Sequence, residues 1–454
     1  MRILIVGAGK VGHALALHLA REEHDVTVLD TDDEAIRRCE DTLDVLCVSG
    51  NGANANSLLE AGADKADILI AATASDEVNM LSCLIAKRLG TRYSIARIRD
   101  PGYNESLNLL KNEMGIDMAV NPERATALEI SRLLRYPYAN DIETFAKGRV
   151  EMVAFRAQKG DPFLDIPLYE ISKKLKNFPQ VLFAAVERDG ELTIPRGDFR
   201  IRAEDRVHVA ADMVNISAFF RYLGRNTAAV KNVMIMGGGR ISYYLSKMIV
   251  PIGIRVTLLE ISEEKANRLS EMLPDVNVIC GDGTDQEVLT QEGLEEMDAF
   301  IALGNRDEEN LMTGLYANHR KVKKVVVKNN RESYEELIQG MGLECMVSPK
   351  DITSQNILRY VRGRVNASGT KVERLYQMMG NQAETLEFVA RAGDSYIGIP
   401  LMKLHILPDS LVAVILRDNR VIVPFGGDTI EVGDRVVIIT KSSGISDLNE
   451  VIGR

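Results

Sequence analysis

The chain has 454 residues and a formal net charge of −10 at pH 7, with 46% hydrophobic and 26% charged residues. This length is too great for one hydrophobic core, so several domains are expected. The acidic balance argues against nucleic acid or anionic lipid as the main partner. No run of about 18 uncharged apolar residues occurs and the N-terminal apolar run is too short for a signal peptide, so we expect a cytosolic protein without membrane insertion.

The first part of the chain alternates apolar runs with helical patterns. Apolar runs predict strands at residues 3–6, 26–29, 45–48, 68–72, 95–98 and 118–120. The runs are continuous, as expected for parallel strands that are covered on both faces. Helical patterns lie between them, such as residues 11–21 and 77–89, and a helix at 122–134 closes the unit. This alternation predicts a doubly wound, Rossmann-like α/β domain over residues 1–140.

Shorter strands follow, with glycine-containing turns between them, and predict a small α+β domain over residues 141–226. The polar joint at residues 224–227 is the best domain boundary. The same plan then recurs, which predicts a second Rossmann-like domain over residues 227–366 and a second small α+β domain over residues 367–454. A repeat of this length indicates a tandem duplication of a domain pair rather than a solenoid.

A glycine motif follows the first strand and opens the first helix. Gly7 permits a tight turn, Gly9 leaves space for a phosphate, and Gly12 lets the helix approach the sheet. The helix N-terminus then offers free N–H groups to a pyrophosphate. The candidate phosphate-binding residues are Gly7, Ala8, Gly9, Lys10, Val11 and Gly12.

Further candidates lie at the ends of later strands, where open α/β sheets bind ligands. Asp30 ends the second strand, where a carboxylate bonds a ribose hydroxyl, and the acidic residues after it disfavour NADP. Asn51, in the loop at residues 50–52, either borders the adenine or belongs to a plain turn. Thr73 and Ala74 follow the fourth strand and are candidates for contacts to phosphate or ribose oxygens. Asp76, which comes shortly after them, is a plausible N-cap of the next helix.

Two arginines, Arg97 and Arg99, end the fifth strand and point to one side of it because Ile98 takes the other. A central parallel strand rarely holds arginines unless an anion faces them. The two arginines therefore either contact a phosphate or pair with local carboxylates such as Asp76.

The second copy repeats these features with substitutions. Its candidate residues are Gly237, Gly238, Gly239, Arg240, Ile241, Glu260, Asp282 and Lys328. Ser242 replaces the third glycine and should push the helix slightly off the sheet. Lys328 aligns with Arg97, but Asn330 aligns with Arg99, so one positive charge is lost. This copy is either a second nucleotide site or a structural pseudo-site.

Catalytic and metal-binding signals are weak. Five cysteines and six histidines are dispersed without metal-ligand spacing. An NAD-dependent oxidoreductase would need an acid or base beside the nicotinamide, and neither small domain offers a clear one. A nucleotide sensor that acts on a partner other than a channel remains an alternative.

Taken in order, the motif GAGKVG, Asp30, the loop at residues 50–52, the segment 73–79 and the run ARIRDP resemble an RCK (KTN) domain. The duplicated pairing with a small domain resembles the TrkA family of peripheral nucleotide-binding subunits. The resemblance implies regulation rather than catalysis. It implies binding of NAD(H) or ATP/ADP and assembly into a homo-oligomeric ring, expected as a tetramer. The ring would sit on the inner face of the membrane and gate a potassium-translocating, TrkH-like membrane subunit.

Overall fold

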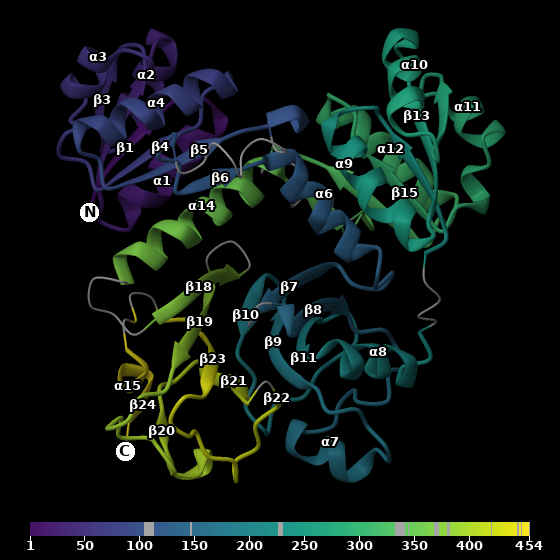
Figure 1. Cartoon of the computed structure of the whole chain (residues 1–454). Helices are drawn as coiled ribbons and strands as arrows, with labels where there is room; N and C mark the ends of the chain where they lie inside the picture. Colours follow the sequence, from purple (N-terminus) through teal and green to yellow (C-terminus); the bar gives the residue numbers. More distant parts are fainter. Residues whose placement is uncertain are drawn as a thin grey trace. The chain divides into compact units, whose positions relative to one another are not determined.

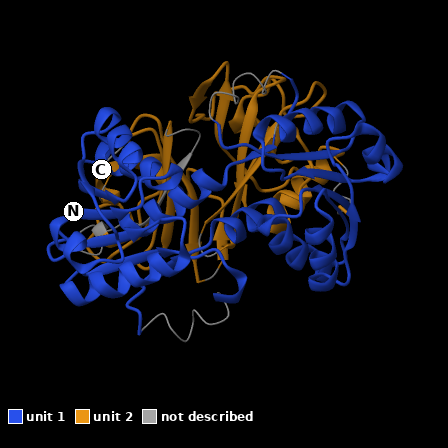
Figure 2. Cartoon of the chain, turned by 90° about the horizontal axis from the view of Figure 1, so that it is seen from above, with its two compact units in different colours: residues 1–131, 232–361 blue, residues 132–231, 362–454 orange. Residues whose placement is uncertain are grey.

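Figure 1 shows a computed structural model of the chain. The structure describes residues 1–103, 113–145, 148–225, 230–331, 341–343, 345–366, 372–378, 382–418, 420–442, 445 and 447–453. The predicted domain boundaries fall partly outside these residues, since residues 226, 227 and 367 are not described. The chain divides into two compact units, each built from two separate stretches (Figure 2). Unit 1 is Met1–Ser131 with Asn232–Val361, and unit 2 is Arg132–Lys231 with Arg362–Arg454.

The first sheet of unit 1 is parallel and has the strand order β3-β2-β1-β4-β5-β6. Its strands are β1 (Arg2–Val6), β2 (Asp25–Asp30), β3 (Leu46–Ser49), β4 (Ile68–Ala71), β5 (Tyr93–Arg97) and β6 (Met118–Val120). In the central strand β1, Ile3 pairs with Val26 on one side and Ile68 on the other. The order reverses between β1 and β4, which places a ligand crevice at their carboxyl ends. The doubly wound prediction is confirmed.

The helices of this domain are α1 (Lys10–Arg21), α2 (Asp33–Thr42), α3 (Ala55–Glu60), α4 (Asp76–Leu89) and α6 (Pro122–Leu133). Side-chain caps start three of them, at Asp32, Asn54 and Ser75. The prediction of Asp76 as a cap is wrong, because the Ser75 hydroxyl accepts the Val78 N–H and Asp76 already lies in the first turn.

The second sheet of unit 1 repeats the same order as β14-β13-β12-β15-β16-β17. Its strands are β12 (Asn232–Met236), β13 (Arg255–Glu260), β14 (Asn277–Cys280), β15 (Ala299–Ala302), β16 (Lys324–Lys328) and β17 (Cys345–Val347). Its helices are α9 (Arg240–Ile249), η2 (Val250–Ile252), α10 (Glu263–Met272), α11 (Gln286–Gln291), η3 (Leu294–Glu296), α12 (Asp307–His319) and α14 (Pro349–Asn366).

Helix α14 follows the second sheet in sequence but packs against the first domain (Figure 1). Its side chains Ile357, Leu358 and Val361 are at most 2% exposed and belong to the core that contains Ile3 and Leu15. Asn121, just before α6, in turn bonds to Tyr244 on α9 of the second domain. Each Rossmann-like domain therefore contacts the other through its final segment.

Unit 2 contains two antiparallel sheets with the orders β10-β9-β11-β8-β7 and β18-β19-β23-β21-β22. The first is built from β7 (Asp141–Phe145), β8 (Val150–Arg156), β9 (Leu182–Arg188), β10 (Glu191–Thr193) and β11 (Arg206–Ala211), with α7 (Leu168–Lys174) and α8 (Met213–Tyr222). The second is built from β18 (Val372–Met378), β19 (Ala383–Val389), β21 (Ser410–Arg417), β22 (Arg420–Ile422) and β23 (Arg435–Thr440). Beside it lie η6 (Leu401–Lys403), α15 (Leu448–Val451) and the paired strands β20 (His405–Ile406) and β24 (Ile452–Gly453).

The two small domains share one core. Met152 and Ala210 of the first sheet pack in the same apolar cluster as Val414 and Ile439 of the second. This arrangement confirms the predicted α+β class, and it explains why like domains group into one unit.

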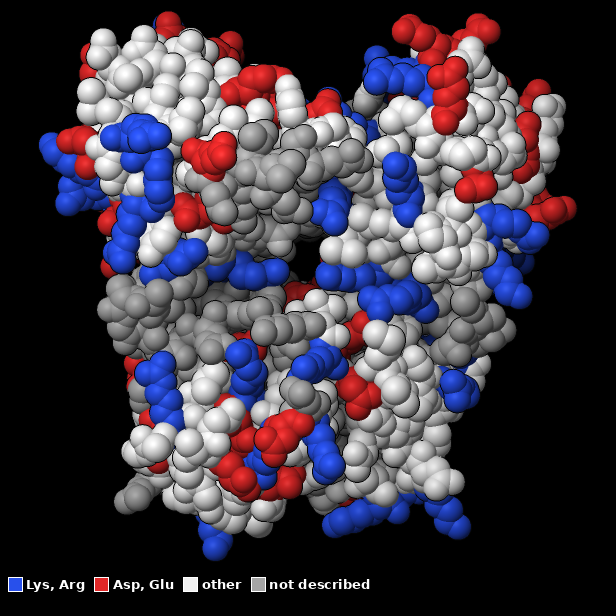
Figure 3. All heavy atoms as spheres, viewed as in Figure 1, with Lys and Arg blue, Asp and Glu red and all other residues white. Residues whose placement is uncertain are grey.

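No helix among the described residues combines the length and apolar character needed to cross a bilayer. Acidic and basic side chains both occur over much of the face shown in Figure 3.

Candidate functional site

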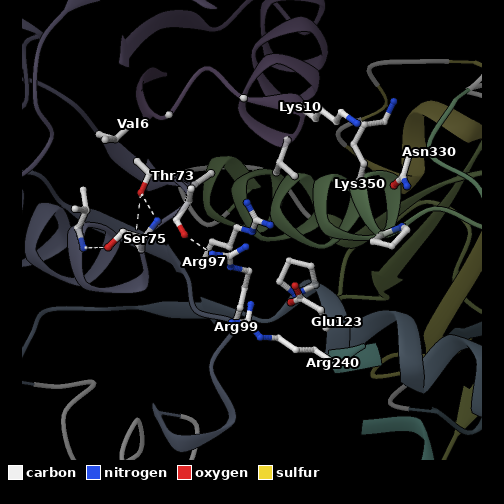
Figure 4. Close-up of a pocket in the computed structure, with 18 of the residues that line it drawn as sticks. Val6, Lys10, Thr73, Ser75, Arg97, Arg99, Glu123, Arg240, Asn330 and Lys350 are labelled. Carbon is white, nitrogen blue, oxygen red and sulfur yellow. Dashed lines mark hydrogen bonds between the residues drawn. The ribbon is translucent and has the colours of Figure 1, made fainter. Parts of the chain in front are cut away.

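A cavity of about 900 Å³ lies in unit 1 and is lined by both glycine motifs (Figure 4). The predicted residues that line it from the first copy are Gly7, Gly9, Lys10, Val11, Asp30, Asn51, Thr73, Ala74, Arg97 and Arg99. Those from the second copy are Gly239, Arg240, Ile241 and Lys328. The predicted residues Ala8, Gly12, Gly237, Gly238, Glu260 and Asp282 do not line it. The first copy therefore lines the cavity with its glycine loop and the ends of its strands. The second copy lines it mainly with the N-terminus of α9 and the ends of its later strands.

The first glycine loop is shaped by three close approaches. Gly7 has a φ of 107°, and a Cβ there would lie 2.9 Å from the Thr73 nitrogen. A Cβ on Gly9 would meet nothing within 4 Å, so this position is open. A Cβ on Gly12 would lie 1.8 Å from the Gly7 carbonyl oxygen, so only glycine allows this packing of α1. The loop leaves the N-terminus of α1 facing the cavity, where its N–H groups favour an anion.

The second loop solves the same contact differently. Ser242 replaces the third glycine, is fully buried, and donates a hydrogen bond from its hydroxyl to the Gly237 carbonyl at 2.5 Å. Because a Cβ at the matching Gly12 would overlap its loop, α9 must lie farther from its loop than α1 does.

The strand-end carboxylates hold the glycine loops. Asp30 accepts the Ala8 N–H at 2.5 Å and the Asp32 N–H at 3.0 Å. Glu260 accepts the Gly238 N–H at 2.8 Å and the Ser262 N–H at 2.9 Å. A carboxylate has about four lone-pair positions, so Asp30, which lines the cavity, can still accept a ligand hydroxyl.

Asn79 is a positioning residue that the motif search does not identify. It is fully buried on α4, accepts the Thr73 N–H at 2.8 Å, and donates to the Arg97 carbonyl at 2.8 Å. Asn310 makes the equivalent contact to the Lys328 carbonyl at 3.1 Å. The signal was the recurrence of this asparagine at the same place in both copies.

Arg97 is the last residue of β5, whereas Arg99 lies two residues after the strand ends, so the prediction that both belong to the strand is wrong for Arg99. Arg99 Nε lies 3.6 Å from Asp76 Oδ1, and the Arg99 N–H donates to the same carboxylate at 2.8 Å. Among the described residues neither Arg97 Nε nor Arg99 Nε has a hydrogen-bond partner, but only Arg99 has a carboxylate, that of Asp76, within ion-pair distance of this atom. Burial and then the charge of Arg99 lower the pKa of the Arg97 guanidinium, against the opposing effect of Glu123. Arg97 is therefore the arginine that an added anion would stabilise more.

Basic side chains from the two copies meet across the cavity. The charge of Arg240 also acts on Arg97, and the charge of Lys10 acts on Lys328. Burial is the largest cause of the lowered pKa of Lys328. Figure 4 draws Lys10 and Lys350 on one side of the cavity and Arg97, Arg99 and Arg240 on the other. These basic groups exceed the lining carboxylates, which are Asp30 and Glu123.

Glu123 and Lys350 were not anticipated as lining residues. Each lies in the first turn of a helix that begins with proline, α6 at Pro122 and α14 at Pro349. The matching tripeptides Asn-Pro-Glu and Ser-Pro-Lys in the two copies were a usable signal. The position of Glu123 and Lys350 in the cavity, however, depends on how the two Rossmann-like domains pack against each other.

Two family models each match the chain twice. The TrkA-N domain matches residues 3–122 and 233–349, and the TrkA-C domain matches residues 152–224 and 386–453. The Trk system potassium uptake protein TrkA of Vibrio alginolyticus is 33% identical, over 99% of this chain and 98% of its own length. The TrkA homolog 2 of Methanosarcina mazei is 31% identical, over 99% of this chain and 100% of its own length.

Solved structures share the fold. The GsuK RCK domain covers 97% of this chain and 92% of its own, with a TM-score of 0.63 and 19% identity. The GsuK channel bound to NAD has the same TM-score and identity and covers 97% of this chain and 77% of its own. With two matched domain pairs and full-length relatives above 30% identity, the chain belongs to the TrkA family.

Proposed function

We propose that this chain is the nucleotide-binding regulatory subunit of a potassium-uptake system. The observation that carries the proposal is the cavity that Gly7, Gly9, Asp30 and Arg97 of the first copy line together with Arg240 and Lys328 of the second. A surplus of partly buried cations beside a helix N-terminus is the electrostatic signature of an anion site. Full-length relatives named as Trk potassium uptake proteins support the transport context.

The ligand that best suits the cavity is NAD(H) or an adenine nucleotide such as ATP or ADP. Asp30 would accept a ribose hydroxyl, Asn51 would border the base, and the glycine loop would hold the phosphates. Arg97, Arg240 and Lys328 would then neutralise the phosphate charge from both sides. Structures of the GsuK channel with NAD and with ADP belong to a protein of the same fold.

The second copy would act mainly as the other wall of this site. Gly239, Arg240, Ile241 and Lys328 line the cavity, whereas Glu260, only 8% exposed, and Asp282 do not. We therefore expect one nucleotide per chain, bound through the adenosine features of the first copy. Occupancy of a second site would require Glu260 to bind a ribose.

Nucleotide binding would act on the membrane partner by a change of shape. A ligand shifts a conformational equilibrium only when it binds one conformation more tightly, and a tenfold preference corresponds to about 1.4 kcal/mol per site. Helices α6 and α14 start beside the cavity and run in sequence to the boundary of unit 2 at residues 131–132 and 361–362. They are the direct covalent routes from the site to the small domains.

The partner would be a potassium-translocating, TrkH-like membrane subunit, gated by a homo-oligomeric ring of this chain, expected as a tetramer. The ring would lie on the cytoplasmic side and reach the membrane through its partner. The role is regulatory rather than catalytic, since the cavity's charged groups are suited to holding phosphates. The competing NAD-dependent oxidoreductase would instead turn over a substrate with NAD(H).

Titration calorimetry with NADH, NAD, ADP and ATP tests the proposal. Micromolar binding at one nucleotide per chain, lost in Asp30→Ala and kept in Glu260→Ala, is the expected result. Equal loss in both variants, with two nucleotides bound per wild-type chain, would contradict the single site. Absence of binding by the wild type would remove the nucleotide-sensing function itself.

A further inference from the structure

We infer that Tyr244 is a positioning residue. Its hydroxyl holds α9, the helix of the second copy that begins at Arg240, close to Arg97 and Arg99 of the first copy, where the phosphates of a nucleotide would bind. This inference rests on the proposed function, because it concerns the same nucleotide. Tyr244 lies on α9 one turn after Arg240 and is 9% exposed.

The hydroxyl joins three elements at one point. It accepts a hydrogen bond from Asn121 Nδ2 at 3.0 Å and lies 3.4 Å from the Arg99 carbonyl oxygen, to which it donates. Asn121 Nδ2 also donates to that carbonyl at 3.2 Å, while Asn121 Oδ1 accepts the Arg124 N–H at 2.8 Å. The end of β5, the start of α6 and the first turns of α9 are thus tied together.

Each of the three elements carries a charged group of the cavity. The end of β5 and the segment after it carry Arg97 and Arg99, α6 carries Glu123, and α9 carries Arg240. Without an anion, the three arginines repel one another, and this repulsion favours movement of α9 away from β5. A buried polar contact opposes that movement, so it would hold Arg240 where it can reach a phosphate.

The contact exists on one side of the cavity. The position that matches Tyr244 in the first copy is Ala14 on α1, which has no side-chain donor. Asn330 of the second copy matches Arg99 and donates hydrogen bonds to Asp307. Ser348 matches Asn121, and its hydroxyl accepts the Asp351 N–H. Both sets of bonds lie within the second copy. Tyr244 therefore adds a link that the duplication alone does not provide.

Tyr244→Phe tests the role, because it keeps the buried ring and removes only the hydroxyl. A neutral hydrogen bond of ordinary strength corresponds to about a fivefold change in an equilibrium constant. We expect the affinity for ATP to fall about fivefold and the affinity for adenosine, which has no phosphate to reach Arg240, to stay the same. Tyr243→Phe is the matched control on the same helix and should change neither affinity.

Asn121→Asp gives a second, independent variant. Aspartate keeps the acceptor that caps α6 but replaces the donor that reaches Tyr244. It should lower ATP affinity in the same direction, and the two effects should add to less than their sum, because both variants remove the hydrogen bond between Asn121 and Tyr244.

The outcomes separate this inference from the function beneath it. Wild-type ATP binding with unchanged affinity in Tyr244→Phe would overturn the role of the hydroxyl and leave the nucleotide site intact. Equal losses for ATP and adenosine would also overturn it, since they indicate a general packing role. A wild type that binds no nucleotide would remove both proposals.

Discussion

The two Rossmann-like domains have the same strand order, yet they contribute to the cavity unequally. The first presents its glycine loop, its strand-end carboxylate Asp30 and the loop around Asn51, whereas the second presents chiefly Arg240, Lys328 and the start of α14. A shared backbone plan therefore does not imply a shared role. After duplication, one copy can keep the ligand contacts while the other supplies the opposing wall.

The third glycine position should separate the copies most strongly. Gly12→Ser introduces the residue that the second copy has, but its Cβ would lie 1.8 Å from the Gly7 oxygen. We expect a loss of about 3 kcal/mol in the free energy of unfolding, with loss of nucleotide binding. Ser242→Gly is the reverse change and should cost about 1 kcal/mol, the worth of its bond to Gly237. Denaturant unfolding and calorimetry measure both, and equal costs would contradict the difference in helix position.

Replacing the strand-end carboxylates Asp30 and Glu260 should affect nucleotide affinity differently but lower the free energy of unfolding similarly. Asp30→Ala removes the carboxylate that we propose accepts a ribose hydroxyl, so nucleotide affinity should fall about thirtyfold. Glu260→Ala should leave affinity within about twofold. Both variants free two backbone N–H groups and should lower the free energy of unfolding by similar amounts. Unchanged affinity in Asp30→Ala would remove its ribose-binding role.

The matched cations Arg97 and Lys328 should respond to phosphate charge. Arg97→Ala should weaken ATP about tenfold, ADP less and adenosine not at all, because each phosphate adds charge for the guanidinium to neutralise. Lys328→Ala should follow the same order with smaller losses, since its ammonium also donates to the Leu303 carbonyl at 3.4 Å. Equal losses for adenosine and ATP would identify Arg97 as a structural residue.

The smallest expected effect contrasts the small domains. His208 on β11 is buried beside Arg206, and burial is the main reason its pKa falls to about 3, whereas the matching residue on β23 is Val437. The pKa of a histidine in the unfolded chain is about 6.5. As the pH falls below that value, the unfolded state binds a proton at His208 that the folded state does not bind. The stability contribution is thus present above about pH 6.5 and declines toward about pH 3.

His208→Val should remove this dependence. Between about pH 7 and pH 6, wild type should lose about 0.7 kcal/mol more than the variant in the free energy of unfolding, measured in denaturant. His405→Val, an exposed histidine of the second small domain, is the control and should behave as wild type. Parallel pH profiles for wild type and His208→Val would show that His208 does not set the slope.

Much of the fold could be predicted from local pattern. The apolar run of β1 and the glycine motif after it mark a buried parallel strand and a helix start, because both signals lie within about ten residues. The placement of Asp30 and Arg97 at strand ends follows from the same register. Asp76 misled the prediction, since an acid at a helix start suggests a cap, but its carboxylate instead holds the N–H groups of Arg99 and Asp100.

The cavity itself could not be predicted in this way. Glu123 and Lys350 line it because each copy's last helix approaches the other copy, and no pattern within one copy encodes that approach. The sequence pattern of α14 predicts an apolar helix face, but it does not predict which domain that face packs against. Ile357 and Val361 would satisfy the core of either domain by hydrophobicity alone.

Helix α14 also sets the order in which the protein can mature during synthesis. The first domain's own strands end at Val120, but its core closes only when Val361 has left the ribosome. At about 5–20 residues per second, that delay is on the order of ten to fifty seconds. For this interval the apolar surface that Ile357, Leu358 and Val361 complete stays uncovered on the nascent chain. Chaperone capture should therefore be strongest while the second Rossmann-like domain is being translated.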